Sequence, residues 1–184
     1  MILTRRRVME VGGGFFLAAF TVRPALPAEG DVIDITMRGK ADGSHVWFDP
    51  VGVHIQPGQT LRWTNCDPGN SHTVTSYHSD VFERPLRIPA GAKPWNSDYL
   101  LPSESFSLTF TVEGVYDYYC VPHEHAGMVG RIIVGSARAV ASVGATQEAG
   151  LTPLPEVALN GFPPVDEIVA KGVVHRDDQA AQQG

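Results

Sequence analysis

A cysteine, a histidine and a methionine lie close together in the second half of the sequence, and their side chains can bind a metal ion. Residues 120–128 read CVPHEHAGM, which places Cys120, His123 and Met128 within nine residues. A second imidazole, that of His72, lies far upstream in the segment NSHTV. One cysteine and two histidines with a weak axial methionine form the ligand set of a blue-copper site. The residue types therefore predict one copper ion, bound by His72, Cys120, His123 and Met128.

Copper with this ligand set is suited to carrying single electrons. Soft sulfur ligands favour Cu(I), whereas imidazole accepts both Cu(I) and Cu(II). A coordination geometry between those that Cu(I) and Cu(II) prefer means that the ligands move little when an electron is gained or lost. The electron transfer is therefore fast. The ligand set thus indicates an electron carrier.

Each predicted ligand also has an ordinary structural explanation. A lone histidine is more often a surface or core residue than a ligand, and a methionine beside Val129 is more often core filling. Zinc fits less well than copper, because structural zinc sites usually use more cysteines or paired histidine motifs. A disulfide between Cys66 and Cys120 would consume the thiolate that copper needs, so copper binding predicts a free or buried Cys66. The histidines without ligand-like spacing are predicted to lie at the surface: His45, His54, His78 and His175.

Short segments of alternating polarity must position these side chains. In residues 105–110, for example, Phe106, Leu108 and Phe110 alternate with serine and threonine, as in a strand with one buried face. Glycine, proline and asparagine separate the segments and supply turns. The pattern predicts an all-β fold, a two-sheet Greek-key β-sandwich of seven to eight strands. The clearest strands are predicted at 32–37, 51–55, 60–64, 73–76, 105–110, 115–120 and 129–134.

Residues 31–135 resemble the cupredoxin family, in particular its plastocyanin and pseudoazurin branch. The copper loop of that branch has the form Cys-x2-His-x4-Met, which Cys120, His123 and Met128 match in spacing. Residues 48–50 and 53–65 are similar to the family's first strands and lead to His72, and VYDYYC at 115–120 is similar to the strand that delivers the cysteine. The resemblance implies type 1 copper and outer-sphere electron transfer through the imidazole edge of His123, where the loop approaches the surface among Pro122, Ala126 and Gly127.

The loop also departs from the branch at its supporting positions. Asn often follows the first histidine ligand, and Ser or Thr often follows the cysteine, as a pair that braces the loop. This sequence has Thr73 and Val121 there. Thr73 can still form a hydrogen bond, so we expect altered bracing. His125 is the competing ligand within the loop, but its use would give Cys-x4-His-x2-Met, which matches neither the plastocyanin nor the azurin form.

Two other copper functions compete with the electron carrier. Multicopper oxidases and copper nitrite reductases of this fold have a histidine directly beside the copper cysteine, whereas Tyr119 and Val121 flank Cys120 here. We therefore predict that the protein is not an enzyme. The alternative is a periplasmic copper-binding carrier without a role in electron transfer. An exchangeable site would favour many methionines, but only Met37 and Met128 follow residue 28.

The N-terminus predicts export. Residues 5–7 are three arginines, an apolar run follows at 11–22, and the small-residue stretch PALPA lies at 24–28. The paired arginine resembles a twin-arginine export signal. An ordinary Sec signal or a retained anchor is the alternative, but the apolar run is shorter than the roughly 20 residues of a membrane span, which favours removal. Cleavage after Ala28 would leave 14 − 4 = 10 basic and 20 − 1 = 19 acidic side chains, a net charge of −9. An acidic protein repels nucleic acid. We expect a periplasmic or otherwise exported monomer without stable membrane insertion, whose partners are redox proteins such as c-type cytochromes or a dehydrogenase or reductase.

The composition divides the chain into three parts. Residues 1–28 form the predicted signal peptide, 29–135 the cupredoxin domain and 136–184 an extension rich in Ala, Pro and Gly. We expect this extension to be mobile except for one short helix at 164–174, which docks on the sandwich. Within the domain, the irregular segment 77–102 is predicted to cross between the sheets.

Overall fold

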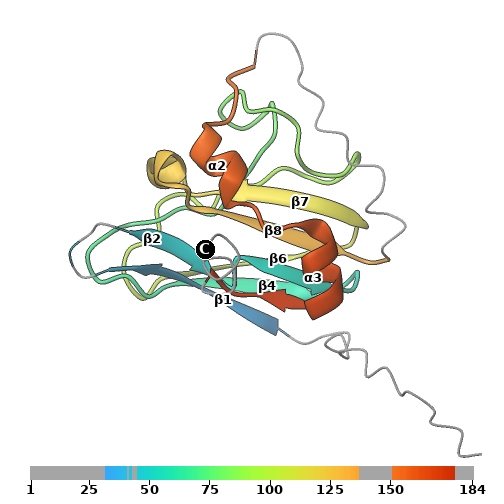
Figure 1. Cartoon of the computed structure of the whole chain (residues 1–184), viewed down its shortest axis with the longest axis horizontal. Coiled ribbons are helices and arrows are strands. Elements are labelled where there is room, and N and C mark those ends of the chain that lie inside the picture. Colours follow the sequence, from blue (N-terminus) through green and yellow to red (C-terminus); the bar gives the residue numbers. More distant parts are fainter. Residues whose placement is uncertain (1–31, 41, 43–44, 137–150, 177–184) are drawn as a thin grey trace, which may run out of the picture.

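Two β-sheets pack face to face in the computed structural model, which describes residues 32–40, 42, 45–136 and 151–176. Figure 1 shows the sheets as two layers, with strand orders β2-β1-β4-β6 and β5-β7-β8-β3-β9. The predicted sandwich is confirmed. Among the described residues, eight strands fall within 32–134, and a ninth follows the C-terminal helices.

The described elements, in chain order, are β1 (Val32–Gly39), β2 (Val46–Asp49), β3 (Gly52–Ile55), β4 (Thr60–Asn65), β5 (Thr75–Ser76), β6 (Ser105–Thr109), β7 (Gly114–Tyr119), the 3-10 helix η1 (Val121–Ala126), β8 (Val129–Val134), α2 (Glu156–Gly161), α3 (Val165–Lys171) and β9 (Val173–Val174).

The two sheets differ in how they meet solvent. In β4 the buried Leu61 and Trp63 alternate with the more exposed Arg62 and Thr64, as expected for a strand with one face in the core. Every residue of β7 is buried, and so is every residue of β8 except Arg131. The five-stranded sheet is therefore covered on both faces, which strand alternation alone did not predict.

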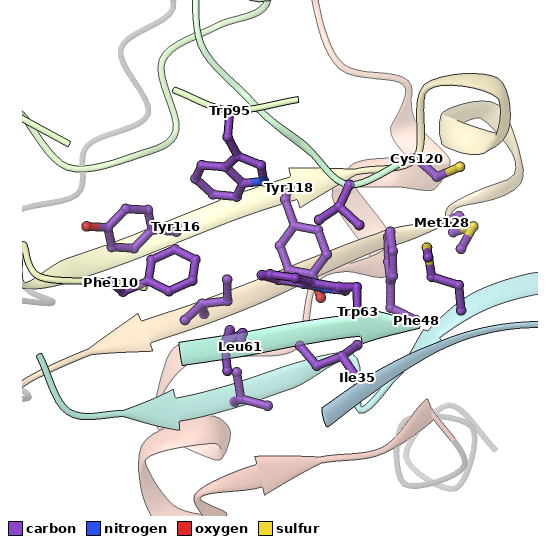
Figure 2. Close-up of a cluster of buried hydrophobic side chains, with 14 of the residues drawn as sticks. Ile35, Phe48, Leu61, Trp63, Trp95, Phe110, Tyr116, Tyr118, Cys120 and Met128 are labelled. Carbon is purple, nitrogen blue, oxygen red and sulfur yellow. The ribbon is translucent and has the colours of Figure 1, made fainter. Parts of the chain in front are cut away.

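Aromatic side chains fill the space between the sheets. The Trp63 ring packs edge-on against Tyr118, with ring centroids 5.5 Å apart, and Phe110 packs edge-on against Tyr116 at 5.1 Å. Figure 2 shows Trp95, Phe110 and Tyr116 at one end of this core, and Cys120 and Met128 at the other. The sulfur-bearing side chains thus lie at one end of the sandwich.

The segment 77–102 connects the two sheets, as predicted, because it runs from β5 in one sheet to β6 in the other. Its Trp95 side chain is buried in the core, and Ser76 pairs with the backbone of Trp95 through hydrogen bonds in both directions. Near its end Leu100 forms a β-bridge with His72. This irregular segment therefore holds the backbone of one predicted ligand.

The C-terminal segment 151–176 packs on the five-stranded sheet. Helix α3 lies within the predicted range 164–174, but α2 and β9 were not predicted. Strand β9 pairs antiparallel with β3, and Ile168 of α3 packs beneath it against Val51 and Ile133. In Figure 1, α2 lies on the outer side of β7 and β8. No helix in the described part of the chain is long and apolar enough to span a membrane.

One histidine lies elsewhere than predicted. His54 is buried in β3 and its Nε2 atom lies 2.7 Å from the carbonyl oxygen of Gly135, so the prediction that it lies at the surface is wrong. The cause is the position of β3 between β8 and β9, which covers both of its edges. His45 and His78 are half-buried, and His175 is exposed.

Candidate metal centre

The backbone of His72 is fixed just before β5. Its N–H donates to the carbonyl of Leu100 at 3.1 Å, and its carbonyl accepts from the N–H of Leu100 at 2.8 Å. The predicted strand 73–76 is shorter in the structure, where β5 begins at Thr75. The His72 side chain has no exposed surface, so it points into the protein.

The other three predicted ligands lie on one tight loop between β7 and β8. Cys120 follows directly after β7, His123 lies in η1, and Met128 directly precedes β8. The N–H of Cys120 donates to the carbonyl of Met128 at 3.0 Å, and the N–H of His123 donates to the carbonyl of Cys120 at 3.0 Å. Gly127 ends η1 with a φ of 75°, a left-handed conformation that favours glycine. The loop therefore brings residues 120, 123 and 128 to one place.

Three predicted ligand atoms form a compact triangle. The Nδ1 atoms of His72 and His123 are 3.2 Å apart, and Cys120 Sγ lies 3.6 Å from the first and 3.3 Å from the second. Ligand atoms that each lie about 2.0–2.3 Å from one ion are about 3.3–4.0 Å apart in tetrahedral or trigonal geometry, close to these distances. The donors fit a single metal ion of this size. In the described residues no other group of three His, Cys, Asp or Glu side chains is this close.

Met128 lies beside this triangle. Its side chain is fully buried and belongs to the same core cluster as Cys120. Figure 2 shows the sulfur atoms of both residues at the same end of the core. His125, the competing histidine, is exposed and does not belong to the metal-binding group. The geometry therefore brings the four predicted residues together and leaves His125 out.

Comparison with known proteins shows the family and its metal. Residues 35–135 match the family described as copper binding proteins, plastocyanin/azurin family. The chain belongs to this family. Copper is accordingly its metal, and a group of two imidazoles, a thiolate and a thioether suits that ion.

Individual relatives show how far the similarity extends. The plastocyanin of Scenedesmus fuscus is 37% identical over 105 residues, which cover 55% of this chain and 99% of that protein. The pseudoazurin of Methylorubrum extorquens is 29% identical over 122 residues, 65% of this chain and 73% of that protein. The crystal structure of native pseudoazurin from Hyphomicrobium denitrificans superimposes with a TM-score of 0.50 at 23% identity, covering 71% of this chain and 94% of that one, and shows the same fold.

The altered bracing pair of this cupredoxin still makes contacts. The backbone N–H of Thr73 donates to Cys120 Sγ at 3.3 Å, and the Thr73 hydroxyl accepts from the N–H of Val121 at 2.8 Å. A side chain on one segment therefore still ties the two ligand-bearing segments together, as expected.

Burial sets the protonation of the metal-free site. It lowers the pKa of His72 and of His123 below the usual imidazole value, and it raises the pKa of the Cys120 thiol to about 11. Near neutral pH both imidazoles are therefore uncharged and have a lone pair for a metal, whereas the thiol must lose its proton before it can bind one.

Two carboxylates beside the ligands were missed by the sequence analysis. Glu124 is buried within the copper loop, where it accepts a hydrogen bond of 2.9 Å from the Tyr77 hydroxyl and forms an ion pair with Arg84. Asp67 is buried with its Oδ2 atom 3.1 Å from Nε2 of His72. The sequence shows only that Asp67 lies five residues before His72 and that Glu124 directly follows His123.

The remaining cysteine does not form a disulfide. Cys66 is free and exposed, and Cys120 is free and buried. The prediction that Cys66 is not paired with Cys120 is confirmed.

Proposed function

We propose that this protein is a mononuclear type 1 copper electron carrier, which takes one electron from a reduced partner and passes it to an oxidised partner. One observation carries the proposal: the Nδ1 atoms of the buried His72 and the half-buried His123 and the Sγ atom of the buried Cys120 lie 3.2–3.6 Å apart beside Met128. Bound copper would supply the redox chemistry, because it alternates between Cu(I) and Cu(II) without a bond being made or broken in the partners.

The protein's own residues would keep the ligands still during transfer. The reciprocal hydrogen bonds of His72 with Leu100 fix one ligand to the segment 77–102. The bonds between residues 120, 123 and 128 close the loop on itself. Ligand side chains held in this way move little when the charge of the site changes, which favours fast transfer. Burial of Cys120 and Met128 also keeps water away from the sulfur atoms.

His123 offers the shortest way to the surface. Its side chain is half-buried, whereas those of His72, Cys120 and Met128 have no exposed surface. We propose that the electron enters and leaves through the His123 imidazole, with the partner docked over it. Among the residues expected around this point, Pro122 and Ala126 are exposed, but Gly127 is buried beneath Val157 of α2.

Helix α2 adds apolar surface beside this docking face. Val157 is 44% exposed and Leu159 is 48% exposed, and α2 packs directly on η1. Redox proteins such as c-type cytochromes, or a dehydrogenase or reductase, are the partners that we propose for this surface. We also propose that residues 1–28 direct the protein to the periplasm, where residues 29–135 act as a monomeric cupredoxin domain and 136–184 as its extension.

The electron carrier is favoured over a copper enzyme and over an exchangeable copper carrier. Tyr119 and Val121 beside Cys120 offer no imidazole that could relay electrons to a second copper, and the described residues hold no second metal-binding group of this kind. A carrier that releases copper needs accessible ligands, whereas three of the four proposed ligands are fully buried here. We therefore infer a non-catalytic protein that retains its metal.

Copper loading of matched cysteine variants tests the proposal. The oxidised wild-type protein should bind one copper per chain and show the intense visible absorption and the EPR signal of a Cu(II)–thiolate site. The Cys66→Ala variant should keep both signals, and Cys120→Ala should lose them. A colourless loaded protein would refute the proposal. Rapid loss of copper to a mild chelator would instead support the exchangeable carrier.

A further inference from the structure

The buried carboxylate of Asp67 contacts the outer nitrogen of the His72 ring. Asp67 Oδ2 lies 3.1 Å from Nε2, and the two side chains are 2% and 0% exposed. The inner nitrogen, Nδ1, faces His123 Nδ1 at 3.2 Å and Cys120 Sγ at 3.6 Å. Building on the proposed function, we propose that Asp67 is a positioning residue that fixes the orientation and tautomer of His72 and favours Cu(II) over Cu(I) at the site.

The carboxylate is itself held by donors only. Its Oδ1 accepts from the N–H of Gly69 at 2.9 Å, and its Oδ2 accepts from the Asn70 side-chain amide at 2.8 Å. A backbone N–H and an amide NH2 can only donate, so they match an ionised carboxylate. An ionised carboxylate in turn can only accept. His72 must therefore donate from Nε2, which leaves the Nδ1 lone pair directed toward the other ligand atoms.

Asn65 ties this carboxylate to the backbone of the same ligand. Its Oδ1 accepts from the N–H of Asp67 at 2.9 Å. Its amide donates to the carbonyl of Leu100 at 2.9 Å, and Leu100 is the β-bridge partner of His72. The backbone and the ring of His72 are thus anchored to one polar network.

The fold also leaves space for the carboxylate. Gly39, at the end of β1, lies so close that a Cβ atom there would collide with the Asp67 carboxylate. A side chain at residue 39 would displace Asp67 from His72. The contact therefore depends on a glycine from another strand as well as on its own loop.

The two imidazoles of the site differ in whether a carboxylate contacts the ring. Within the described residues, no carboxylate bonds to the ring of His123, which is half-buried. The proposed exit for the electron is thus the less anchored ring of His123, whereas the negatively charged carboxylate lies behind the anchored ring of His72. A carboxylate behind a metal-bound histidine increases the basicity of the ring and orients it. Because a buried negative charge attracts the ion of higher charge more strongly, Asp67 favours Cu(II).

Substitution of Asp67 by its neutral isostere separates charge from shape. Asp67→Asn should weaken Cu(II) binding about tenfold, in line with other residues behind metal ligands. Cu(I) binding should change less, so the redox equilibrium shifts toward Cu(I) by up to tenfold, which is 59 mV for a one-electron couple. The control is Asp34→Asn, which removes the same charge from an exposed ion pair with Arg62. It should leave the equilibrium between Cu(II) and Cu(I) within twofold of the wild-type value. Equal potentials for the two variants would overturn the charge effect.

A measurement on the wild-type protein without metal tests the positioning effect. Nitrogen-15 NMR of the imidazoles should show the proton of His72 on Nε2, and Asp67→Ala should give a mixture of tautomers. A proton on Nδ1 in the wild type would overturn the proposal, and this readout needs neither copper nor a folded variant. It also separates the two ideas: a protein that shows the Nε2 tautomer but no blue copper would refute the proposed function and leave the anchoring of His72 in place.

Discussion

The Thr73 hydroxyl accepts a hydrogen bond of 2.8 Å from the backbone N–H of Val121. These residues follow the ligands His72 and Cys120 directly, so the bond joins the two segments that carry them. The Thr73 hydroxyl also lies 2.9 Å from that of Thr75 in β5. One threonine thus connects the strand and the copper loop, although the side chain that would follow the cysteine in related loops is replaced by valine.

Removal of this hydroxyl should loosen the copper loop. Thr73→Val keeps the shape but leaves the Val121 N–H without its acceptor, so the free energy of unfolding should fall by about 1–2 kcal/mol. Thr73→Ser keeps the hydroxyl, so its free energy of unfolding should fall by less than half of that amount. Urea unfolding of the metal-free variants measures the difference. Equal losses would show that the methyl group, and not the hydrogen bond, matters at this position.

The copper loop could be predicted from the sequence because its ligands are close together along the chain. Cys120, His123 and Met128 lie on one strand–loop–strand unit, whose spacing alone limits the geometry. His72 could be named only from its strand context. Asp67 and Glu124 could not be predicted, since a carboxylate near a histidine is usual on exposed loops and only the tertiary fold shows that these two are buried.

The C-terminal segment was harder to predict for a different reason. Helix α2 has six residues and β9 has two, which is too short for a reliable period of apolar residues. Both depend on tertiary contacts, such as the pairing of β9 with β3. The burial of His54 follows from the same pairing. A pattern within one segment cannot show what a distant segment will cover.

Gly127 should tolerate no side chain. Its φ is +75°, and a Cβ atom would lie 3.2 Å from the Val157 side chain and 3.3 Å from the Val157 carbonyl oxygen. Gly127→Ala should therefore combine left-handed strain with this contact and lower the free energy of unfolding by about 2–3 kcal/mol. Gly91 is a matched control, because its φ is +84° but nothing lies within 4 Å. Gly91→Ala should lose only about 1 kcal/mol. Equal losses in urea unfolding would exclude an effect of α2 on the loop.

The ion pair of Glu124 and Arg84 should behave as a coupled unit. Their side chains are 1% and 13% exposed, so removal of one charge leaves the other buried without a partner. Glu124→Gln should therefore lower the free energy of unfolding by about 3 kcal/mol. Arg84→Met in the same background should restore part of that loss. Chemical unfolding of the two single variants and the double variant gives the coupling energy, and simple additivity would contradict a direct ionic interaction.

Phe162 should anchor the C-terminal segment to the sheet. The guanidinium groups of Arg87 and Arg131 each lie 5.0 Å from the centroid of its ring, and Asp117 pairs with both arginines. Phe162→Leu keeps apolar volume but removes both cation–π contacts, worth about 1–2 kcal/mol together. Amide hydrogen exchange should then accelerate in residues 151–176 and stay unchanged in β7 and β8. The exposed Phe82 provides the control, since Phe82→Leu should change neither. Uniform acceleration would show that the segment is not a separate unit.

Copper uptake by the metal-free protein should release one proton per site. Burial raises the pKa of the Cys120 thiol to about 11, so the thiol is protonated near neutral pH, whereas the lowered pKa values of His72 and His123 leave both imidazoles uncharged. Copper binds the thiolate, so the Cys120 thiol must lose its proton on binding, and a higher pH makes this loss easier. The affinity for copper should therefore rise with pH, by about tenfold per pH unit from 7 to 9 as expected for one proton, and this gain should end near the thiol pKa. Calorimetry in buffers of different ionisation enthalpy counts the protons. Cys66→Ser should leave the count at one, and release of none would mean that the thiolate is already formed before the metal binds.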